Sequence, residues 1–410
     1  MPIDFIANFF HYPKNIIQRN NVNPVNFKQK SGDTFVKTIS VDSDSASDYN
    51  GITITEKNFG TLAKTGDNVK LYTITNKNGA SVDLSEFGAT IVSIKIPDKN
   101  GKIIDVTQGY NDVSPYENSP VGHAGGTIGP CANKIDGGKF SINGKKYELE
   151  KNKDNGKTHC HGGSNGFDVK LWQTKVLPDG IQFTYNKKDM ENGYPGNVNL
   201  TVTYKFDNNN NLRIIYNAIS DKDTLLNLTN HTYFNLDGEE NTKENSVLEH
   251  IVNLPNSSKI TLNNEMAIPT GNFEDIENTP FDFKTPHKIG ENINTPSKQL
   301  EIGSGYDQNY CVDNYDGKSV IEIANVKSDK TGIKLKVSTN LPGFQFYTAN
   351  HLGKNAQPEG KSGMRYEKRS ALCIEPQFYP NAINTKEFEE KGILKKGEKY
   401  DREIIYSFSL

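Results

Sequence analysis

The sequence predicts an all-β protein built as a large antiparallel β-sandwich. Short segments in which apolar and polar residues alternate recur from about residue 58 to residue 410, and Gly, Asn, Asp and Pro residues separate them. Such alternation indicates strands with one buried face, and no segment carries the long apolar repeat of about 3.6 residues that marks an amphipathic helix. Strands spaced by roughly 8–12 residues with turn residues between them are typical of a sandwich.

Two hairpin signals stand in the first half of the chain. KLYTIT at residues 70–75 is followed by NKNG at 76–79, and the Asn-Gly pair predicts a tight turn. KFSINGKKYEL at residues 139–149 predicts a hairpin around the Asn-Gly pair at 143–144. In this hairpin we expect Phe140 and Ile142 to face Tyr147 and Leu149.

The second half of the chain predicts further strands of the same kind. They are NVNLTVTYKF (197–206), NLRIIYNAIS (211–220), GIKLKVST (332–339) and the final segment EIIYSFSL (403–410). A run of four asparagines (208–211) lies at the junction of the first two of these strands, as expected of a polar turn.

The amino-terminal segment differs from the rest of the chain. Residues 1–55 are rich in Asn, Ser and Asp and show weak periodicity. We expect them to form a polar extension, partly disordered or draped on the surface. Residues 56–410 are then the sandwich domain.

Composition narrows the functional classes. The net charge is -3 and the basic residues are scattered, which does not favour a nucleic-acid or membrane-surface partner. The four cysteines are far apart and form no CxxC pair, so we expect free thiols in the cytoplasm and no metal site. No apolar run approaches the ~20 residues that span a bilayer.

Four polar, glycine-containing stretches interrupt the strand pattern. They are GGTIGPCANKIDGG (125–138), THCHGGSNGFD (158–168), LTNHTYFNLDG (228–238) and CIEPQFYPNAIN (373–384). Each has a structural explanation by itself, such as turn glycines or a hydrogen-bonded core histidine. His159 and His161 are two residues apart on an extended segment, so at most one of them faces a given pocket. Together the stretches supply imidazoles, carboxylates, amides and aromatic rings, a set that suits the hydroxyls and the apolar face of a sugar.

The motifs in their order resemble the aldose 1-epimerase, or galactose mutarotase, family from about residue 59 to residue 410. The resemblance rests on FGATIVSIKIPDKNG (87–101), GGTIGPCANKI (125–135), HGGSNGFDVKLW (161–172), ENGYPGNVNLTVTY (191–204), NLTNHTYFNLDG (227–238), IPTG (268–271), TPFDF (279–283), GYDQNY (305–310) and CIEPQFYPNAIN (373–384). It implies a supersandwich fold and a cofactor-independent isomerase that interconverts the anomers of free hexoses.

The resemblance also implies roles for single residues. His231 is implied to be the general acid and Glu375 the general base. The residues implied to bind sugar hydroxyls are Asn133, Lys134, His161, Asp307 and Gln345. This chain departs from the family at Lys134, where arginine is usual, at Pro130, where Gly-Arg is usual in place of Gly-Pro, and at Gln308, where histidine is common.

Two alternatives remain open on the sequence. A hexose-6-phosphate 1-epimerase would need a cationic pocket, but the arginines Arg213, Arg365, Arg369 and Arg402 are dispersed. A non-catalytic carbohydrate-binding protein could lack His231 or Glu375, and both are present. We expect a sugar as the only ligand and a monomer or weak dimer, while the preferred aldose stays open.

Overall fold

The computed structural model describes residues 37–38, 51–117, 123–353 and 357–410. The predicted extension therefore lies largely outside the described residues, and its role stays a prediction. Strand β2 begins at Thr53, and the two-residue strand β1 (Lys37–Thr38), which lies within the predicted extension, pairs with it. The body described below is the compact unit of residues 36–410.

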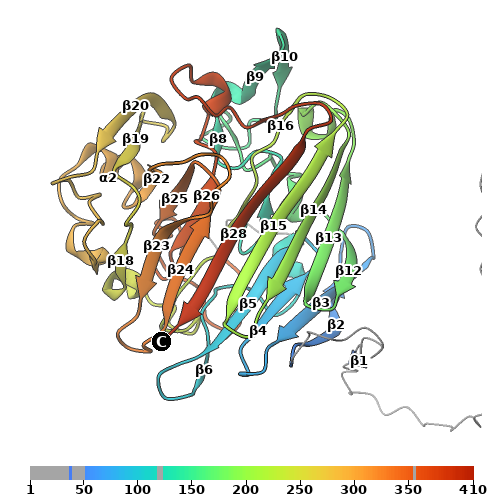
Figure 1. Cartoon of the computed structure of the whole chain (residues 1–410), viewed down its shortest axis with the longest axis vertical. Coiled ribbons are helices and arrows are strands. Elements are labelled where there is room, and N and C mark those ends of the chain that lie inside the picture. Colours follow the sequence, from blue (N-terminus) through green and yellow to red (C-terminus); the bar gives the residue numbers. More distant parts are fainter. Residues whose placement is uncertain (1–36, 39–50, 118–122, 354–356) are drawn as a thin grey trace, which may run out of the picture. The chain divides into compact units, whose positions relative to one another are not determined.

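A nine-stranded antiparallel sheet forms one layer of the molecule (Figure 1). In spatial order its strands are β12 (Gln173–Leu177), β13 (Gly180–Lys187), β14 (Val198–Phe206), β15 (Asn211–Ser220), β28 (Lys399–Ser409), β24 (Lys334–Thr339), β23 (Ile321–Lys327), β18 (Ile251–Asn253) and β21 (His287–Lys288). The carboxy-terminal strand β28 lies in the middle and joins the two halves of the sheet.

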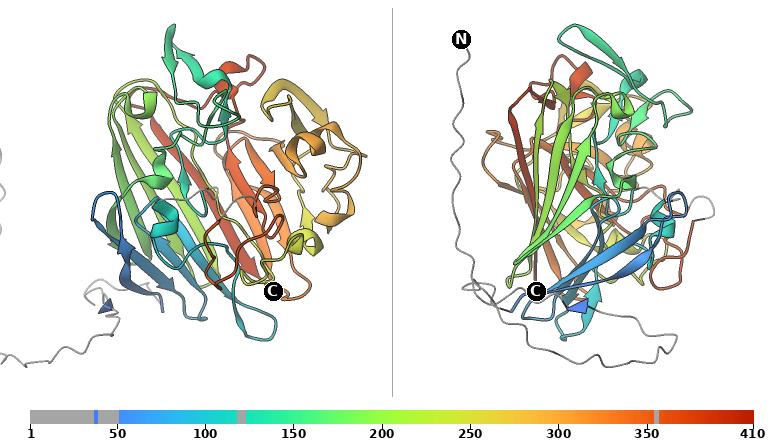
Figure 2. Two further views of the ribbon diagram at one scale, coloured as in Figure 1. Left: turned by 180° about the vertical axis from the view of Figure 1, so that it is seen from behind. Right: turned by 90° about the vertical axis from the view of Figure 1, so that its right-hand side faces the viewer.

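Two smaller sheets form the second layer, seen from behind in Figure 2. The six-stranded sheet contains β1 (Lys37–Thr38), β2 (Thr53–Thr61), β3 (Asn68–Thr75), β4 (Ser81–Ser85), β5 (Thr90–Pro97) and β6 (Ile103–Asp105). The five-stranded sheet contains β20 (Pro269–Asp275), β19 (Lys259–Asn263), β22 (Asp307–Cys311), β25 (Gly343–Tyr347) and β26 (Cys373–Gln377).

Short elements connect the layers. The paired strands are β7 (Thr127–Ile128) with β17 (Thr229–Asn230), β8 (Lys134–Ile135) with β11 (His159–Cys160), β9 (Lys139–Ile142) with β10 (Lys145–Glu148), and β16 (Thr224–Leu225) with β27 (Ile393–Leu394). The helices are α1 (Ser114–Glu117), α2 (Lys298–Gly303) and the single-turn helices η2 (Asp136–Gly138), η3 (Phe167–Val169), η4 (Glu191–Gly193), η5 (Ser246–Glu249), η6 (Ile289–Glu291) and η7 (Ala382–Asn384).

The strands form where the alternation of the sequence predicts them. In β15, the side chains of Leu212, Ile214 and Tyr216 are fully buried and their neighbours along the strand are more exposed. The predicted hairpin is β9–β10, with Phe140 opposite Tyr147 and their rings stacked at 5.1 Å between centroids. The all-β sandwich predicted from the sequence is confirmed.

One large hydrophobic cluster lies between the layers, and residues of all three large sheets contribute to it. Strand β4 is buried along its whole length. Val82 and Leu84 belong to the large cluster, and on the other face the buried Asp83 carboxylate lies 2.8 Å from Lys95 Nζ. Each fully buried Leu, Ile or Phe side chain stabilises the fold by roughly 1.5–3 kcal/mol. The sandwich therefore provides a rigid support for polar groups at its surface.

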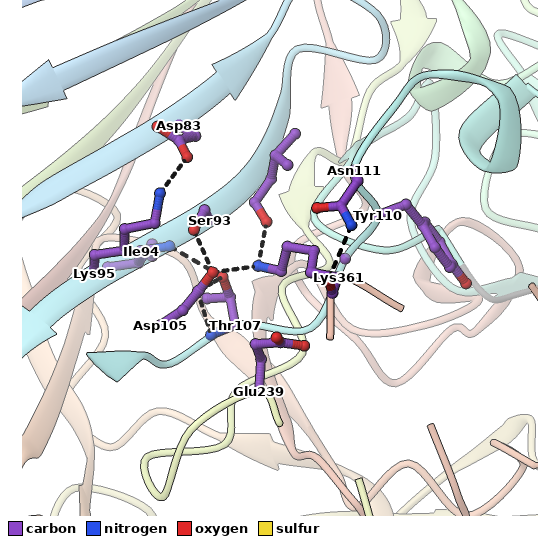
Figure 3. Close-up of polar contacts among 12 residues, drawn as sticks. Asp83, Ser93, Ile94, Lys95, Asp105, Thr107, Tyr110, Asn111, Glu239 and Lys361 are labelled. Carbon is purple, nitrogen blue, oxygen red and sulfur yellow. Dashed lines mark hydrogen bonds and ion pairs between the residues drawn. The ribbon is translucent and has the colours of Figure 1, made fainter. Parts of the chain in front are cut away.

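A long connection, residues 357–370, is tied to the six-stranded sheet (Figure 3). Lys361 Nζ lies 2.7 Å from a carboxylate oxygen of Asp105 and donates to the carbonyl of Val92 at 2.8 Å. Asn111 Nδ2 donates to the carbonyl of Lys361 at 2.9 Å. These contacts hold a segment whose first residue lines the cavity described below.

In the described part of the chain, no helix is both long enough and apolar enough to cross a membrane.

We expect the sandwich to fold without its amino-terminal segment. A variant lacking residues 1–50 loses β1, which pairs with β2 at only two positions, Lys37 with Glu56 and Thr38 with Thr55. Its melting temperature should fall by less than about 4 °C, since a domain this large shifts by roughly that much per kcal/mol. A variant lacking residues 1–35 retains β1 and is the matched control. A larger fall in both variants would show that the segment stabilises the core.

Candidate active site

A cavity of about 780 Å³ opens beside the five-stranded sheet, where the short strand pairs β7–β17 and β8–β11 approach it. Its volume lies in the usual range for a small-molecule site. All seven site residues predicted from the sequence line it: Asn133, Lys134, His161, His231, Asp307, Gln345 and Glu375. They come from six separate segments of the chain, so the fold alone brings them together.

The five-stranded sheet positions the carboxylates. Glu375 is the central residue of β26 and pairs with Gln345 of β25. Asp307 begins β22, and Gln345 Nε2 donates to its Oδ1 at 2.6 Å. The other side of the Gln345 amide accepts from Gln377 Nε2 at 3.2 Å. These bonds fix the direction of the Gln345 amide and place two carboxyl groups and one amide in a row.

The pair β7–β17 positions His231. This residue directly follows β17, and its backbone N–H donates to the carbonyl of Gly126 at 3.1 Å, while its carbonyl accepts from the N–H of Gly125 at 2.8 Å. The ring stacks on Tyr233 with centroids 4.9 Å apart. The strand ladder on one side and the tyrosine ring on the other therefore restrain the imidazole.

His231 and Glu375 face each other across the cavity floor. His231 Nε2 lies 3.6 Å from Glu375 Oε2, and only 6% and 3% of the two side chains are exposed. This Glu375 oxygen has no hydrogen-bond partner among the described residues. On its other side, His231 Nδ1 lies 3.6 Å from the Cys373 thiol. The pair thus leaves a proton donor and a proton acceptor open toward a bound molecule.

His161 enters from the pair β8–β11. Its backbone N–H donates to the carbonyl of Asn133 at 3.1 Å, and the N–H of Asn133 donates to His161 Nδ1 at 3.2 Å. Because Nδ1 accepts a hydrogen bond, the neutral ring carries its proton on Nε2. His159 is buried elsewhere, with Nε2 2.8 Å from the Tyr194 hydroxyl and Nδ1 2.7 Å from the Glu150 carbonyl. Of the two histidines, His161 alone lines the cavity.

Burial governs the charges of these groups. Loss of water around the ring, and then repulsion from His123, lowers the pKa of His231 to about 3. Burial likewise holds the pKa of His161 well below its usual value. Burial, and then the charge of Asp307, raises the pKa of Glu375 well above its usual value, and burial also raises the pKa of Asp307. Burial therefore favours the uncharged form of both imidazoles and shifts both carboxyl groups toward their protonated forms.

Lys134 lines the cavity and is held at its wall. Its Nζ lies 3.0 Å from an Asp154 oxygen and donates to the carbonyl of Met266 at 2.5 Å. Only 14% of the Lys134 side chain is exposed, so it is not a freely solvated surface lysine. The ammonium also donates to the other Asp154 oxygen at 3.4 Å, so a ligand could take the donor that makes this longer contact.

The other two departures from the family lie away from the cavity lining. Gln308 is buried between strands and helix α2, where it accepts from Asn263 at 2.6 Å and donates to Gln299 at 2.7 Å. Pro130 follows a cis peptide bond, and its carbonyl accepts from the N–H of Asn227 at 2.8 Å. Neither side chain is among those that line the cavity.

His123 and Asp168 also line the cavity and are not among the residues predicted from the sequence. His123 Nδ1 lies 2.6 Å from Asp168 Oδ2. The His123 ring lies 4.8 Å from that of His161 and 6.1 Å from that of His231, between centroids. Two features of the sequence could have indicated these residues. His123 stands two residues before the Gly-Gly pair at 125–126, and Asp168 follows Gly-Phe in the segment that contains His161.

Among the described residues, the arrangement nearest to a metal-binding set consists of His161, His231 and Glu375, whose ligand atoms all lie within 4.8 Å of one another. The same short distances suit proton transfer to and from a small molecule held between an imidazole and a carboxyl group.

Solved structures with this architecture are known. The crystal structure of an aldose epimerase homologue from C. elegans matches with a TM-score of 0.72 at 30% identity, covering 81% of this chain and 96% of that chain. The crystal structure of galactose 1-epimerase from Lactobacillus acidophilus NCFM matches with a TM-score of 0.73 at 24% identity, covering 88% and 99%. At that identity the second likeness concerns the fold.

Sequence relatives cover nearly the same part of the chain. Galactose mutarotase of Mus musculus is 34% identical over 360 residues, which are 88% of this chain and 99% of the mouse protein. Aldose 1-epimerase of Escherichia coli (strain K12) is 31% identical over 350 residues, which are 85% of this chain and 97% of the bacterial protein. The family model described as aldose 1-epimerase matches residues 70–407. This chain therefore belongs to the aldose 1-epimerase family.

Proposed function

We propose that this protein interconverts the α and β anomers of free hexoses such as glucose and galactose by acid–base opening and reclosure of the sugar ring. The observation that carries the proposal is the buried pair of His231 and Glu375, 3.6 Å apart in a cavity lined with polar groups. Relatives named galactose mutarotase and aldose 1-epimerase support it.

The chemistry needs one base and one acid. Glu375 removes the proton from the anomeric hydroxyl, the C1–O5 bond breaks as C1=O forms, and His231 delivers a proton to O5. Rotation about C1–C2 presents the other face of the aldehyde, and the same transfers run backwards on closure. Each positioned group of this kind typically accelerates a reaction by roughly 10²–10⁴-fold. Neither group is consumed.

The protonation of the pair fits this cycle. Burial favours neutral His231 and protonated Glu375, so the pair holds one proton in the free protein. The reactive form, imidazolium with carboxylate, also holds one proton, and it becomes accessible when sugar hydroxyls and the ring oxygen solvate the charges. The neutral form is the state that follows ring opening. One proton on the pair therefore suffices for both halves of the reaction.

The remaining polar groups can bind hydroxyls. We assign hydroxyl binding to Asp307 and Gln345 on the five-stranded sheet, and to Asn133, Lys134 and His161 on the β8–β11 side. Carboxylates accept and amides or imidazoles donate, so the two sides offer complementary partners to a polyol. The rings of Tyr233 and Tyr347 also line the cavity and offer apolar surface to the sugar.

The alternatives receive less support. A phosphorylated hexose calls for arginine forks, and no arginine is among the described residues that line the cavity. A carbohydrate-binding protein without catalysis has no need for a desolvated acid–base pair.

We further propose a cytoplasmic location, because all four cysteines are free and buried, and a monomer or weak dimer in solution.

Replacing Glu375 by glutamine tests the base. Glu375→Gln is nearly isosteric but cannot accept a proton, so kcat should fall by roughly 100-fold or more. Polarimetry of freshly dissolved α-glucose and α-galactose measures the rate, and calorimetric titration measures sugar binding, which should survive. Glu249→Gln, at an exposed ion pair with Lys288, is the matched control. A Glu375→Gln variant that keeps more than about one tenth of the activity contradicts the assignment.

The pH dependence tests the shared proton. The pair of His231 and Glu375 gains a second proton only near the lowered His231 pKa of about 3. It loses its one proton only above the raised pKa of Glu375. Therefore kcat/KM, after subtraction of the spontaneous rate, should stay level as the pH falls through 4.5, the ordinary value for a glutamate. Fluorescence of the single tryptophan, Trp172, reports whether the fold is intact at each pH. An acid limb at pH 4.5 or above would be incompatible with the account.

Removing Lys134 tests its contact with the sugar. A charged hydrogen bond contributes about 1.5–3 kcal/mol, so Lys134→Ala should lower kcat/KM roughly ten- to a hundred-fold, while Lys134→Arg should retain activity. Asp154→Asn separates the two explanations, because it releases the lysine without removing it. If Asp154→Asn reproduces the loss seen in Lys134→Ala, the lysine merely holds the wall and does not bind substrate.

A further inference from the structure

His123 and Asp168 form a second polar pair in the cavity, beside the residues assigned above. His123 Nδ1 and Asp168 Oδ2 are 2.6 Å apart, and the side chains are 28% and 8% exposed. Both residues line the cavity. His123 therefore reaches the space that a substrate would occupy, and Asp168 is the more buried of the two.

Close packing holds Asp168 in place. A Cβ atom on Gly126 would lie 2.8 Å from Asp168 Cβ, and a Cβ atom on Gly166 would lie 2.8 Å from Asp168 Oδ1. Any larger residue at either glycine would displace the carboxylate. Asp168 Oδ1 is buried and has no hydrogen-bond partner among the described residues. The buried Asp168 carboxylate is thus positioned to hydrogen-bond to His123.

The Asp168 contact sets the tautomer of His123. An ionised carboxylate only accepts hydrogen bonds, so His123 Nδ1 carries the proton and, in the neutral ring, Nε2 is an acceptor. His161 has the opposite arrangement, because the Asn133 N–H donates to its Nδ1 at 3.2 Å and its Nε2 carries the proton. Two imidazoles with centroids 4.8 Å apart therefore present one acceptor and one donor. A hydroxyl group both donates and accepts, and this combination is complementary to it.

We propose that His123 is a further substrate-binding residue, whose Nε2 accepts a hydrogen bond from one hydroxyl of the sugar, and that Asp168 is a positioning residue that holds His123 in the accepting tautomer. The inference rests on the proposed mutarotation and adds one contact to the same site. His123 takes no part in proton transfer to the reacting atoms, which His231 and Glu375 carry out.

Deoxy sugars distinguish a direct contact from a structural role. His123→Phe keeps a ring but deletes the acceptor, so KM for glucose should rise about tenfold, equivalent to about 1.4 kcal/mol, with kcat little changed. With the one monodeoxy glucose that lacks the contacted hydroxyl, His123→Phe and the unchanged protein should have equal KM. His123→Gln, whose amide reaches the position of Nε2, should recover most of the affinity. His287→Phe, the same substitution at a histidine outside the cavity lining, should leave KM unchanged.

Asp168→Asn tests the positioning role. The asparagine amide donates to His123 Nδ1, which moves the ring proton to Nε2 and removes the acceptor. Asp168→Asn should therefore raise KM for glucose as His123→Phe does, with the same deoxy sugar insensitive, and should add nothing in a protein that already carries His123→Phe. Melting temperatures of all variants confirm that they are folded.

The contrary results are distinct. Three results would each contradict the proposed contact between His123 and the sugar. KM could stay unchanged in His123→Phe and Asp168→Asn, it could rise by the same factor with every deoxy sugar, or kcat alone could fall. If the unchanged protein fails to accelerate mutarotation of glucose and galactose, the proposed function is wrong, and so is the substrate assigned to His123.

Discussion

The burial of His231 and Glu375 within 3.6 Å of each other is the constraint on which the rest of the site depends. Removing both groups from water makes their charged forms costly, which lowers the pKa of His231 and raises that of Glu375. In water, an imidazole and a carboxylate at this distance would be a weakly coupled ion pair. Buried beside a cavity, the same two groups can carry the proton transfers that we propose for them.

Holding such a pair requires support from independent parts of the fold. Glu375 lies inside the five-stranded sheet, whose register places it opposite Gln345. His231 follows a two-residue strand that pairs with β7, and His161 enters from the β8–β11 pair. The large hydrophobic cluster beneath keeps these pieces from moving apart. The buried Glu375 oxygen that has no hydrogen-bond partner among the described residues costs stability.

Local patterns predicted much of this structure, and long-range contacts account for what they missed. The β9–β10 hairpin follows from an Asn-Gly turn between alternating strands, which a short window of sequence contains. The seven residues predicted to form the site all line the cavity, and they were selected because their motifs resemble those of a known family. The pair of His123 and Asp168, 45 residues apart, has no such local signature, since only the folded chain brings the two together. The same holds for the Lys134 contact with the Met266 carbonyl, which joins segments 132 residues apart.

The central claim is that burial keeps the proton of this pair on Glu375 in the free protein and leaves His231 neutral. Nitrogen NMR of protein labelled in its histidine side chains measures this directly, with His231→Gln used to assign the resonances. The account predicts that His231 stays a neutral imidazole from neutral pH down through 4.5, without passing through a transition near the ordinary histidine value of 6.5. An imidazolium signal for His231 anywhere in that range would contradict it.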